Sequence, residues 1–405
     1  MQNRNIVSSL DIGTSKICAI IGEINNDNML EIIGIGIAPS MGIKKGVIVD
    51  IDSTVKSIIQ AVEKAEQMAN STMKSVFINY TGGSAILIKN KGIVAVRGEN
   101  KEISEQDIER VMQTARVVAV PSDKEIIDII PIEFIVDGYS GIKDPIGMVG
   151  TRLEVDAHII MGSKTSVRSL VKSVQDSGLL VDGIIINPLA ASKVLLSTDE
   201  KELGVALIDI GGGTSEISIF SGGNIIFTKS IPIGGDHITN DIAVGLRIPL
   251  SLAEEIKRKY GCALVAQGDP HLEFCFQRIG DQKSIKIDQC YLAEIIEPRV
   301  LEILDLIRQE LSNFGFLTLL PAGAVITGGG LYSLKGFHEA SKGVLNMPIR
   351  LGTPRYFGVE EPFYSVAVGI LEYVHKSRQY KISPNKTKEA PSILIKIREW
   401  IRDYF

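Results

Sequence analysis

The sequence predicts an α/β protein in which two domains repeat one order of elements. Two observations predict this fold class. One signal occurs twice, as V-S-S-L-D-I-G-T-S-K at Val7–Lys16 and as A-L-I-D-I-G-G-G-T-S-E at Ala206–Glu216. Each copy is an apolar strand that ends in Asp, followed by a Gly turn and a hydroxyl residue. A third apolar strand leads into a Gly turn at Ala324–Gly330, with the sequence A-V-I-T-G-G-G.

The two Asp turns have the chemistry of a phosphate and Mg²⁺ site. Glycine lets the backbone turn tightly, so that N–H groups can approach phosphate oxygens. An Asp at the end of the strand can hold a Mg²⁺ ion through water. Two such turns that face each other would clamp one nucleotide between two domains.

Composition limits the function classes. A chain of 405 residues with 45% apolar and 22% charged residues is ordinary for a packed α/β protein of about two to three domains. A net charge of −5 argues against a nucleic-acid binder. The start of the chain lacks the apolar core of a signal peptide, and no apolar run has the roughly eighteen residues of a membrane span, so we expect a cytoplasmic protein. The cysteines and histidines lack metal-ligand spacing, so no metal beyond Mg²⁺ is expected.

The first half of the chain opens with strands, where a P-loop protein would place a helix. Residues 17–22 and 31–37 are apolar and β-prone. The sequence contains no G-x-x-x-x-G-K-[ST] and no G-x-G-x-x-G string, which excludes Walker and dinucleotide-binding sites. Apolar residues at helical spacing predict a helix over 52–70, and a strand is expected over 75–80.

Residues 84–162 have the features of an insertion into this half. The elements predicted within it are a β pair around Lys91-Gly92, a helix over 105–117 capped by Ser104, a stretch over 131–150 punctuated by Pro and Gly, and a strand over 153–161. The elements predicted after it are a helix over 167–177, a strand over 181–186, and a helix that opens at Asn187 and ends near Ser197.

The second half repeats the order strand, Asp turn, strand, hairpin, strand and helix. Strands are predicted over 217–220 and 225–233 around a Gly222-Gly223 hairpin, and Gly234-Gly235-Asp236 opens a helix. A helical insert is expected over 237–313, with helices over 251–260 and 288–313. The main body resumes at the strand that begins at Ala324.

These motifs together resemble the ribonuclease H-like ATPase fold shared by actin, heat-shock chaperones and sugar kinases. Further motifs are similar to the FtsA family of bacterial cell-division proteins: I-E-F-I-V-D at Ile132–Asp137, D-P-I-G-M-V-G-T-R-L at Asp144–Leu153, I-E-P-R at Ile296–Arg299, and the terminal helix. The similarity covers essentially the whole chain. It implies an actin-like, duplicated two-domain ATPase fold with an FtsA-type inserted subdomain and a C-terminal amphipathic helix.

The resemblance and the order of the motifs predict a division of the chain into six regions. These are the first core subdomain (1–83 with 163–198), the inserted subdomain that the family uses in filament contacts (84–162), the second core subdomain (199–236 with 314–376), a helical insert for nucleotide and for the tail of the tubulin-like protein FtsZ (237–313), a flexible linker (377–391), and a membrane-targeting helix (392–405).

The resemblance also implies roles for the motif residues. Asp11 and Asp209 would approach Mg²⁺ through water. Phosphate would be bound by Gly13, Thr14, Ser15, Lys16, Gly211, Gly212, Gly213 and Thr214. Adenosine would be bound by Gly235, Glu254, Lys257, Gly328, Gly329 and Gly330. For Glu254 and Lys257, an E-x-x-K pair on one helix, a surface ion pair is the open alternative.

One residue departs from the pattern of the hydrolysing relatives. Chaperones and the cell-shape homologue of actin carry an acid before the Pro of an E-P-x-A-A turn, whereas this chain has Asn187 there. An amide can position water but is a poor base at neutral pH. We therefore expect ATP binding with slow hydrolysis at most, and we name no catalytic residue.

The end of the chain predicts a tethered amphipathic helix. From about Ser377 the composition is polar and broken by Pro384 and Pro391, and Ser392 can then cap a short helix. The apolar face of that helix would carry Ile393, Leu394, Ile397, Trp400, Ile401, Tyr404 and Phe405. Such a helix fits binding in the membrane interface, and docking on the protein's own body is the alternative.

The resemblance implies an ATP-binding protein that polymerises on the cytoplasmic face of the cell membrane at the division site. It would be peripheral and would anchor FtsZ filaments there. The implied partners are the FtsZ C-terminal tail, further copies of the chain, membrane lipids and later division proteins, and nucleic acid is excluded. Arg299 is the candidate for binding the acidic FtsZ tail, unless it braces its own helix.

Two alternatives belong to the same superfamily. One is an ATP-binding adaptor of a membrane assembly, like the pilus protein PilM. The other is a small-molecule kinase, which would need a carboxylate base that no residue clearly provides.

Overall fold

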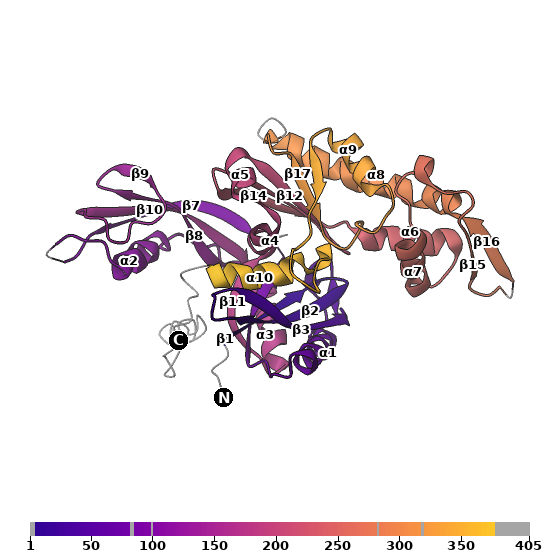
Figure 1. The fold of residues 1–405 in the computed structure, drawn as a ribbon, viewed down its shortest axis with the longest axis horizontal. Helices are drawn as coiled ribbons and strands as arrows, with labels where there is room; N and C mark the ends of the chain where they lie inside the picture. The colour runs from indigo at the N-terminus through magenta and orange to yellow at the C-terminus, as the bar shows by residue number, and fades with distance from the viewer. Residues whose placement is uncertain (1–4, 82–84, 99, 282, 317–319, 377–405) are drawn as a thin grey trace. The chain divides into compact units, whose positions relative to one another are not determined.

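The structure is a computed structural model that describes residues 5–81, 85–98, 100–281, 283–316 and 320–376 (Figure 1). These residues form two compact units: residues 84–170 form one, and the rest of the chain forms the other. The predicted linker over 377–391 and helix over 392–405, with the membrane-facing residues Ile393 to Phe405, lie outside the described residues.

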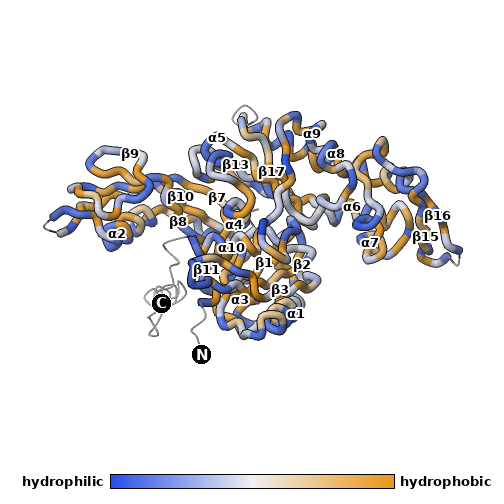
Figure 2. The backbone as a smooth tube through the Cα atoms, in the orientation of Figure 1, coloured by the Kyte–Doolittle hydropathy of each residue, from blue (hydrophilic) through white to orange (hydrophobic). Residues whose placement is uncertain are grey.

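The larger unit begins with a five-stranded sheet among its described residues. Its strands are β1 (Asn5–Ile12), β2 (Lys16–Ile24), β3 (Leu30–Pro39), β6 (Ser75–Tyr80) and β11 (Leu180–Ile186). The order is β11-β6-β1-β2-β3. The strands β1, β2 and β3 form an antiparallel meander, and β6 and β11 add to β1 in parallel. The strands β1 and β2 are buried on both faces over most of their length, and Figure 2 shows hydrophobic residues along β1.

A second described sheet of the same unit has the same plan. Its strands are β12 (Val205–Ile210), β13 (Ser215–Ser221), β14 (Asn224–Ile231), β17 (Ala324–Thr327) and β18 (Ile349–Leu351). The order is β14-β13-β12-β17-β18, again an antiparallel meander joined to two parallel strands. The predicted duplication is therefore confirmed strand by strand, although β14 ends two residues before the predicted Ile233.

Helices cover the first sheet. They are α1 (Ile51–Ala69), α4 (Asn187–Leu195) and α10 (Ser365–Lys376). A further helix, α3 (Lys164–Asp176), contains the boundary between the units. The helix α1 begins at the side-chain cap of Asp50 and buries Ala61 and Ala65 against β3. A short hairpin of β4 (Ile43–Lys44) and β5 (Val47–Ile48) precedes it.

The helix α10 packs against the first sheet, although it follows the second sheet in sequence. It contacts α4 and β1, and the Ser9 hydroxyl donates to the Ala367 carbonyl over 2.8 Å. The helix α10 is buried around its whole circumference from Ser365 to Val374, and it packs against α4 and β1.

The rest of the larger unit is mainly helical. It contains α5 (Thr198–Leu203), α6 (Gly235–Leu246), α7 (Leu250–Tyr260), α8 (Gln289–Asn313) and α9 (Phe337–Leu345). The predicted helical insert also holds a hairpin of β15 (Glu273–Gln277) and β16 (Ser284–Asp288). In that hairpin Phe274 and Phe276 are both buried. They are two residues apart, which is the spacing at which side chains of a strand return to the same face.

The smaller unit is one antiparallel sheet with a helix on one face. Its elements are β7 (Ile86–Ala95), α2 (Glu105–Ala115), β8 (Lys124–Val136), β9 (Tyr139–Ile142) and β10 (Arg152–Ser163), with the strand order β7-β10-β8-β9. The predicted β pair around Lys91-Gly92 is wrong, because β7 runs straight through Gly92 and pairs with β10. In the stretch punctuated by Pro and Gly, β8 passes through Pro131 by means of a bulge.

Among the described helices, none combines the length and the apolar character that crossing a bilayer requires.

Candidate functional site

The two Asp turns have the same backbone geometry. The first joins β1 to β2, and the Gly13 N–H donates to the Lys16 carbonyl over 3.1 Å. The second joins β12 to β13, and the Gly211 N–H donates to the Thr214 carbonyl over 2.9 Å. Each turn lies at the carboxyl end of a strand that has a parallel neighbour. The residues between the ends of each turn therefore project away from the sheet, where ligands bind in open α/β sheets.

The two turns face each other. The Ser15 hydroxyl donates to both Asp236 carboxylate oxygens, over 3.1 and 3.3 Å. A Cβ atom on Gly212 would collide with the Ser15 hydroxyl, so the approach of the loops requires glycine there. The methyl and hydroxyl of Thr14 lie against Gly213, and the Thr14 hydroxyl also accepts from Gly46 N–H over 3.0 Å. The predicted phosphate-binding loops thus meet in one place.

Asp11 and Asp209 form a pair of buried carboxylates at this place. Burial raises the pKa of Asp11 to about 7; Lys16 opposes the rise and the charge of Asp209 adds to it. Burial likewise raises the pKa of Asp209 to about 6. Two buried carboxylates that repel each other are stabilised as anions by a divalent cation. Their oxygen donors are also those that Mg²⁺ prefers, so these residues fit the predicted metal.

An amide network holds the first carboxylate. Asn79, near the end of β6, donates from Nδ2 to Asp11 Oδ1 over 2.7 Å and to Asn187 Oδ1 over 3.1 Å. Its Oδ1 accepts from the Ile12 N–H over 2.7 Å. Sequence reasoning missed Asn79, although a polar residue inside the apolar strand V-F-I-N-Y is a visible signal. Asn187, the residue that departs from the relatives, therefore lies one side chain away from Asp11.

Lys16 is bound by a residue that sequence reasoning also missed. Its Nζ donates to the Phe363 carbonyl over 2.6 Å and lies 3.5 Å from the centre of the Phe363 ring. Burial lowers the pKa of Lys16 to about 8. Phe363 stands directly before α10 and beside Gly329. The lysine of the first Asp turn therefore contacts the segment that leads into α10.

The predicted adenosine residues converge on the second Asp turn. The Gly235 N–H donates to the Gly211 carbonyl over 3.0 Å, and the Gly330 N–H donates to the Ile210 carbonyl over 2.9 Å. Gly328 has a φ of 95°, and a Cβ atom there would collide with the Asp209 carboxylate. The Gly turns after β14 and β17 therefore stack directly on the turn after β12.

The E-x-x-K pair is an interior interaction. Lys257 is 2% exposed, and its Nζ lies 2.7 Å from Glu254 Oε2. The same Nζ donates to the Gly235 carbonyl over 3.1 Å and to the Thr239 hydroxyl over 2.8 Å. Lys257 is thus buried, whereas Glu254 remains partly exposed. The pair instead fixes the start of α6 next to the Gly turn.

Arg299 is bound within the helical insert. Its Nε donates to Asp241 Oδ2 over 2.6 Å and its Nη2 donates to Asp241 Oδ1 over 3.2 Å. It also pairs with Glu302, one turn further along α8. Arg299 therefore joins α8 to α6 through Asp241, and it braces its own helix only through Glu302. A partner's carboxylate would have to compete with Asp241 for the same guanidinium.

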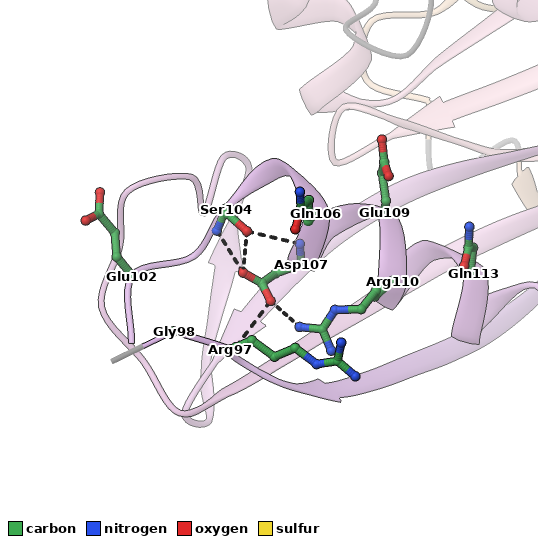
Figure 3. A pocket seen from close by; sticks show the side chains of 9 residues that line it. All are labelled: Arg97, Gly98, Glu102, Ser104, Gln106, Asp107, Glu109, Arg110 and Gln113. Atoms are coloured by element: carbon green, nitrogen blue, oxygen red, sulfur yellow. Dashed lines mark hydrogen bonds and ion pairs between the residues drawn. The ribbon is translucent and has the colours of Figure 1, made fainter. Parts of the chain in front are cut away.

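A pocket in the smaller unit contains none of the predicted site residues (Figure 3). It lies at the start of α2, and Asp107 is its central group. Asp107 accepts from the Ser104 N–H over 2.9 Å and from the Ser104 hydroxyl over 2.6 Å, and it pairs with Arg110. The bond from the Ser104 N–H and a reciprocal bond of 3.4 Å from the Asp107 N–H to the Ser104 hydroxyl form the capping box of α2. The structural role of Asp107 is therefore to cap and stabilise α2.

Comparisons with known proteins agree with this geometry. A family model described as cell division protein FtsA matches residues 206–369, and one described as the SHS2 domain inserted in FtsA matches residues 82–161. The cell division protein FtsA of Pseudomonas aeruginosa is 38% identical over 417 aligned residues, which cover 100% of this chain and 99% of that protein.

Two solved structures share the fold at low sequence identity. A PilM-PilN type IV pilus biogenesis complex aligns with a TM-score of 0.63 at 16% identity, over 91% of this chain and 98% of that one. MreB 5 of Spiroplasma citri bound to AMPPNP aligns with a TM-score of 0.55 at 17% identity, over 100% of both chains. These likenesses show the predicted actin-like fold. The family models and the full-length identity show more: this chain belongs to the FtsA family of cell division proteins.

Proposed function

We propose that this chain is an ATP-binding, actin-like division protein that polymerises on the cytoplasmic membrane, anchors FtsZ filaments there and recruits later division proteins. Family membership supports the role in division. The observation that carries the nucleotide part is the meeting of the two Asp-turn loops around Asp11 and Asp209, with Ser15 bonded to Asp236. A nucleotide bound between the two loops would hold the two halves of the larger unit in one relative arrangement.

ATP with Mg²⁺ is the proposed ligand of this site. The N–H groups and hydroxyls of the Asp turns would bind the phosphates, and Asp11 and Asp209 would hold Mg²⁺ through water. Bound Mg²⁺ supplies positive charge that neutralises the phosphates. Gly235, Lys257 and Gly330 would shape the adenosine end, because Gly235 and Gly330 bond to the second Asp turn and Lys257 bonds to the Gly235 carbonyl. The fold neighbour MreB 5 of Spiroplasma citri, solved with AMPPNP, supports a nucleotide of this class.

Hydrolysis is proposed to be slow. The side chains that approach Asp11 from β6 and α4 are the amides Asn79 and Asn187. Amides do not titrate at neutral pH, so neither can accept the proton of an attacking water. Bound ATP would then persist long enough to keep the chain in a form that polymerises.

Attachment to the membrane is proposed for the terminal helix over 392–405. Its apolar face, from Ile393 to Phe405, suits the interface between lipid headgroups and acyl chains. One such helix binds weakly, whereas a polymer presents many helices, and each later contact becomes intramolecular. Polymerisation and membrane attachment would therefore strengthen each other.

Attachment of FtsZ is proposed for the helical insert, with Arg299 as the residue that binds its acidic tail. Arginine binds carboxylates through two parallel hydrogen bonds, and Arg299 already holds Asp241 in this way. If Asp241 moved away, the Arg299 guanidinium could bind a carboxylate of the FtsZ tail through the same two hydrogen bonds. The pilus adaptor and the small-molecule kinase are not favoured, because the family match covers the full length of an FtsA protein.

Co-sedimentation with lipid vesicles, with and without ATP, tests this proposal. Intact protein should pellet with vesicles and more so with ATP, and Trp400→Glu should abolish the binding by placing a charge in the apolar face. A control variant, Glu399→Gln, changes a charge on the polar face and should still bind. Intact protein that stays in the supernatant under both conditions would rule out the membrane role.

A further inference from the structure

Lys16 is a half-buried cation near two carboxylates, and it pairs with neither of them. Burial lowers the pKa of Lys16 to about 8, and the charges of Asp11 and Asp209 oppose that lowering, so both lie near enough to act on it. Within the described part of the chain, Lys16 nevertheless forms no ion pair. Lys257 of the same unit, in contrast, lies 2.7 Å from Glu254. A lysine has a flexible four-carbon stem, so another contact must hold Lys16 away from the carboxylates.

Phe363 supplies that contact in two ways. Its carbonyl accepts a hydrogen bond of 2.6 Å from Lys16 Nζ, and the centre of its ring lies 3.5 Å from the same nitrogen. The Tyr364 ring packs on the Phe363 ring with 4.3 Å between centres, and its centre lies 5.4 Å from Lys16 Nζ. The face of an aromatic ring attracts a cation and repels an anion. Lys16 is therefore held by a carbonyl and a ring instead of by an acid.

Phe363 is itself fixed by the strand and the Gly turn that precede it in the second half of the chain. The Thr327 hydroxyl, at the end of β17, donates to the Pro362 carbonyl over 3.4 Å and bonds to the Ser365 hydroxyl over 3.0 Å. These two partners lie on either side of Phe363 in the sequence. A Cβ atom on Gly329 would lie only 3.2 Å from the Phe363 Cβ, so the Gly turn after β17 lies directly against it. The position of Phe363 is therefore set by contacts that do not involve Lys16.

The lysine that Phe363 holds keeps donors for a ligand. An ammonium group has three N–H donors, and the Phe363 carbonyl takes one of them. That carbonyl is the one acceptor bonded to Lys16 Nζ among the residues that the structure describes, so two donors remain for phosphate oxygens. Asp11 and Asp209 are likewise not neutralised by this lysine, and their oxygens are the ligands that Mg²⁺ prefers.

We propose that Phe363 is the positioning residue of Lys16 in the nucleotide site. Its carbonyl and ring hold the ammonium group near Asp11 and Asp209 without letting it pair with them. The carboxylates then stay available to Mg²⁺, and the lysine stays available to phosphate. The inference rests on the ATP binding proposed above. It adds to that site an aromatic residue that is 347 positions away from Lys16 in the chain.

Loss of the ring should change the partner of Lys16. In Phe363→Leu the backbone carbonyl remains, but the attraction between the ring and the ammonium group is lost. Lys16 would then pair with Asp11 and Asp209, and it would have to leave them before ATP with Mg²⁺ binds. A cation–π contact is worth about a fivefold change in an equilibrium constant. We therefore expect Phe363→Leu to weaken binding of ATP with Mg²⁺ by about fivefold.

Titration of the full-length protein with a fluorescent ATP analogue in the presence of Mg²⁺ measures this loss. Phe363→Tyr keeps the ring and should bind within about twofold of the intact protein. Phe227→Leu is the matched control, because Phe227 is a half-buried phenylalanine on β14 that packs on Phe314 with 4.6 Å between ring centres. It should also bind within about twofold. If Phe363→Leu does not fold, Phe363→Met takes its place, since it fills a similar volume without a ring.

A double-mutant cycle without nucleotide tests the contact itself. Urea unfolding is measured for the intact protein, Lys16→Met, Phe363→Leu and the double variant. Phe363→Leu should lower the urea midpoint less in the Lys16→Met background than in the intact protein, because the contact is already absent there. Equal shifts in both backgrounds would overturn the inference, since Phe363 would then act on the fold and not through Lys16.

The outcomes separate this inference from the proposed function. If the intact protein binds no ATP, the proposed nucleotide site fails, and this inference fails with it. If the intact protein binds ATP and Phe363→Leu binds it equally well, the positioning role is overturned while the nucleotide site stands. A loss in Phe227→Leu or in Phe363→Tyr as large as that in Phe363→Leu also overturns it, because altered packing would then account for the effect.

Discussion

The Ser15 hydroxyl and the Asp236 carboxylate, 3.1 Å apart, join the loop after β1 to the start of α6. The two residues are 221 positions apart in the chain, and the bond links the first Asp turn to the second half of the larger unit. Asp236 is itself held by the second turn, because its N–H donates to the Gly212 carbonyl over 2.9 Å. A single side-chain contact thus reports whether the two Asp-turn loops are closed on each other.

A double-mutant cycle measures this contact. Ser15→Ala and Asp236→Asn should each lower the free energy of unfolding, and the two effects should be less than additive by about 1 kcal/mol, because either change removes the same charge-assisted bond. Urea unfolding of the four proteins without nucleotide provides the measurement. Strictly additive effects would mean that the loops are not closed in solution.

Stability without ligand should fall as the pH rises from about 4 to about 7. Because burial raises the pKa of Asp11 from 3.8 to about 7, the folded protein keeps a proton there that the unfolded chain has already released. Between about pH 4 and pH 7 this group should therefore cost roughly 1.4 kcal/mol of stability for each pH unit gained.

The variant Asp11→Asn isolates that effect. It cannot titrate, so it should be more stable than the intact protein at pH 8, and this advantage should shrink toward pH 5. Thermal unfolding at the two pH values, without Mg²⁺ or nucleotide, gives the comparison. An advantage of Asp11→Asn that is the same at both values would show that Asp11 has an ordinary pKa.

Asn187→Asp should speed ATP hydrolysis. The new carboxylate would lie beside Asn79 and could orient and deprotonate water, as a general base does. General bases contribute about a hundredfold or more, so we expect a rise of at least about tenfold in phosphate release per bound ATP. Normal ATP binding with unchanged turnover would show that Asn187 does not limit the reaction.

Lys257→Met should weaken ATP binding by about 10- to 100-fold. The variant removes charge-assisted bonds to the Gly235 carbonyl and to Glu254, which together fix the start of α6. Arg258→Met is the matched control, because Arg258 also pairs with Glu254 but is exposed. Titration with a fluorescent ATP analogue gives both dissociation constants, and equal losses in the two variants would contradict a specific role for Lys257.

Asp241→Asn distinguishes the two roles of Arg299. If Arg299 binds the FtsZ tail, weakening its intramolecular pair should tighten binding of a tail peptide several-fold, while Arg299→Glu should abolish it. If Arg299 only braces α8, both variants should lower the unfolding midpoint and neither should change peptide affinity. Fluorescence anisotropy with a labelled tail peptide, together with thermal unfolding, reports both quantities.

The parts of the site that could be predicted are local in the sequence. The loops at Gly13 and Gly211 each follow an apolar run that ends in Asp, and such a strand and turn are specified within about ten residues. The duplicated strand order follows from the same signals. The helix α1 was predictable to within one residue at each end, because its apolar period and its cap are both local.

The parts that could not be predicted depend on distant contacts. Asn79 reaches Asp11 because β6 pairs with β1 in parallel, and Lys16 reaches Phe363 across 347 positions of sequence. The sheet that α10 packs against is also decided by distant contacts, because the helix is buried all round from Ser365 to Val374 and has no single apolar face to orient it. Arg299 could not be assigned from I-E-P-R alone, since its partner Asp241 lies on another helix.

Recruitment of FtsZ filaments to vesicles by this chain tests the central claim most directly. Fluorescent FtsZ, unable to bind lipid alone, is mixed with vesicles, ATP and either the intact chain or Trp400→Glu. The account predicts filaments on the vesicle surface with the intact chain, fewer without ATP, and none with Trp400→Glu. Filaments that stay in solution although the intact chain itself coats the vesicles would contradict it.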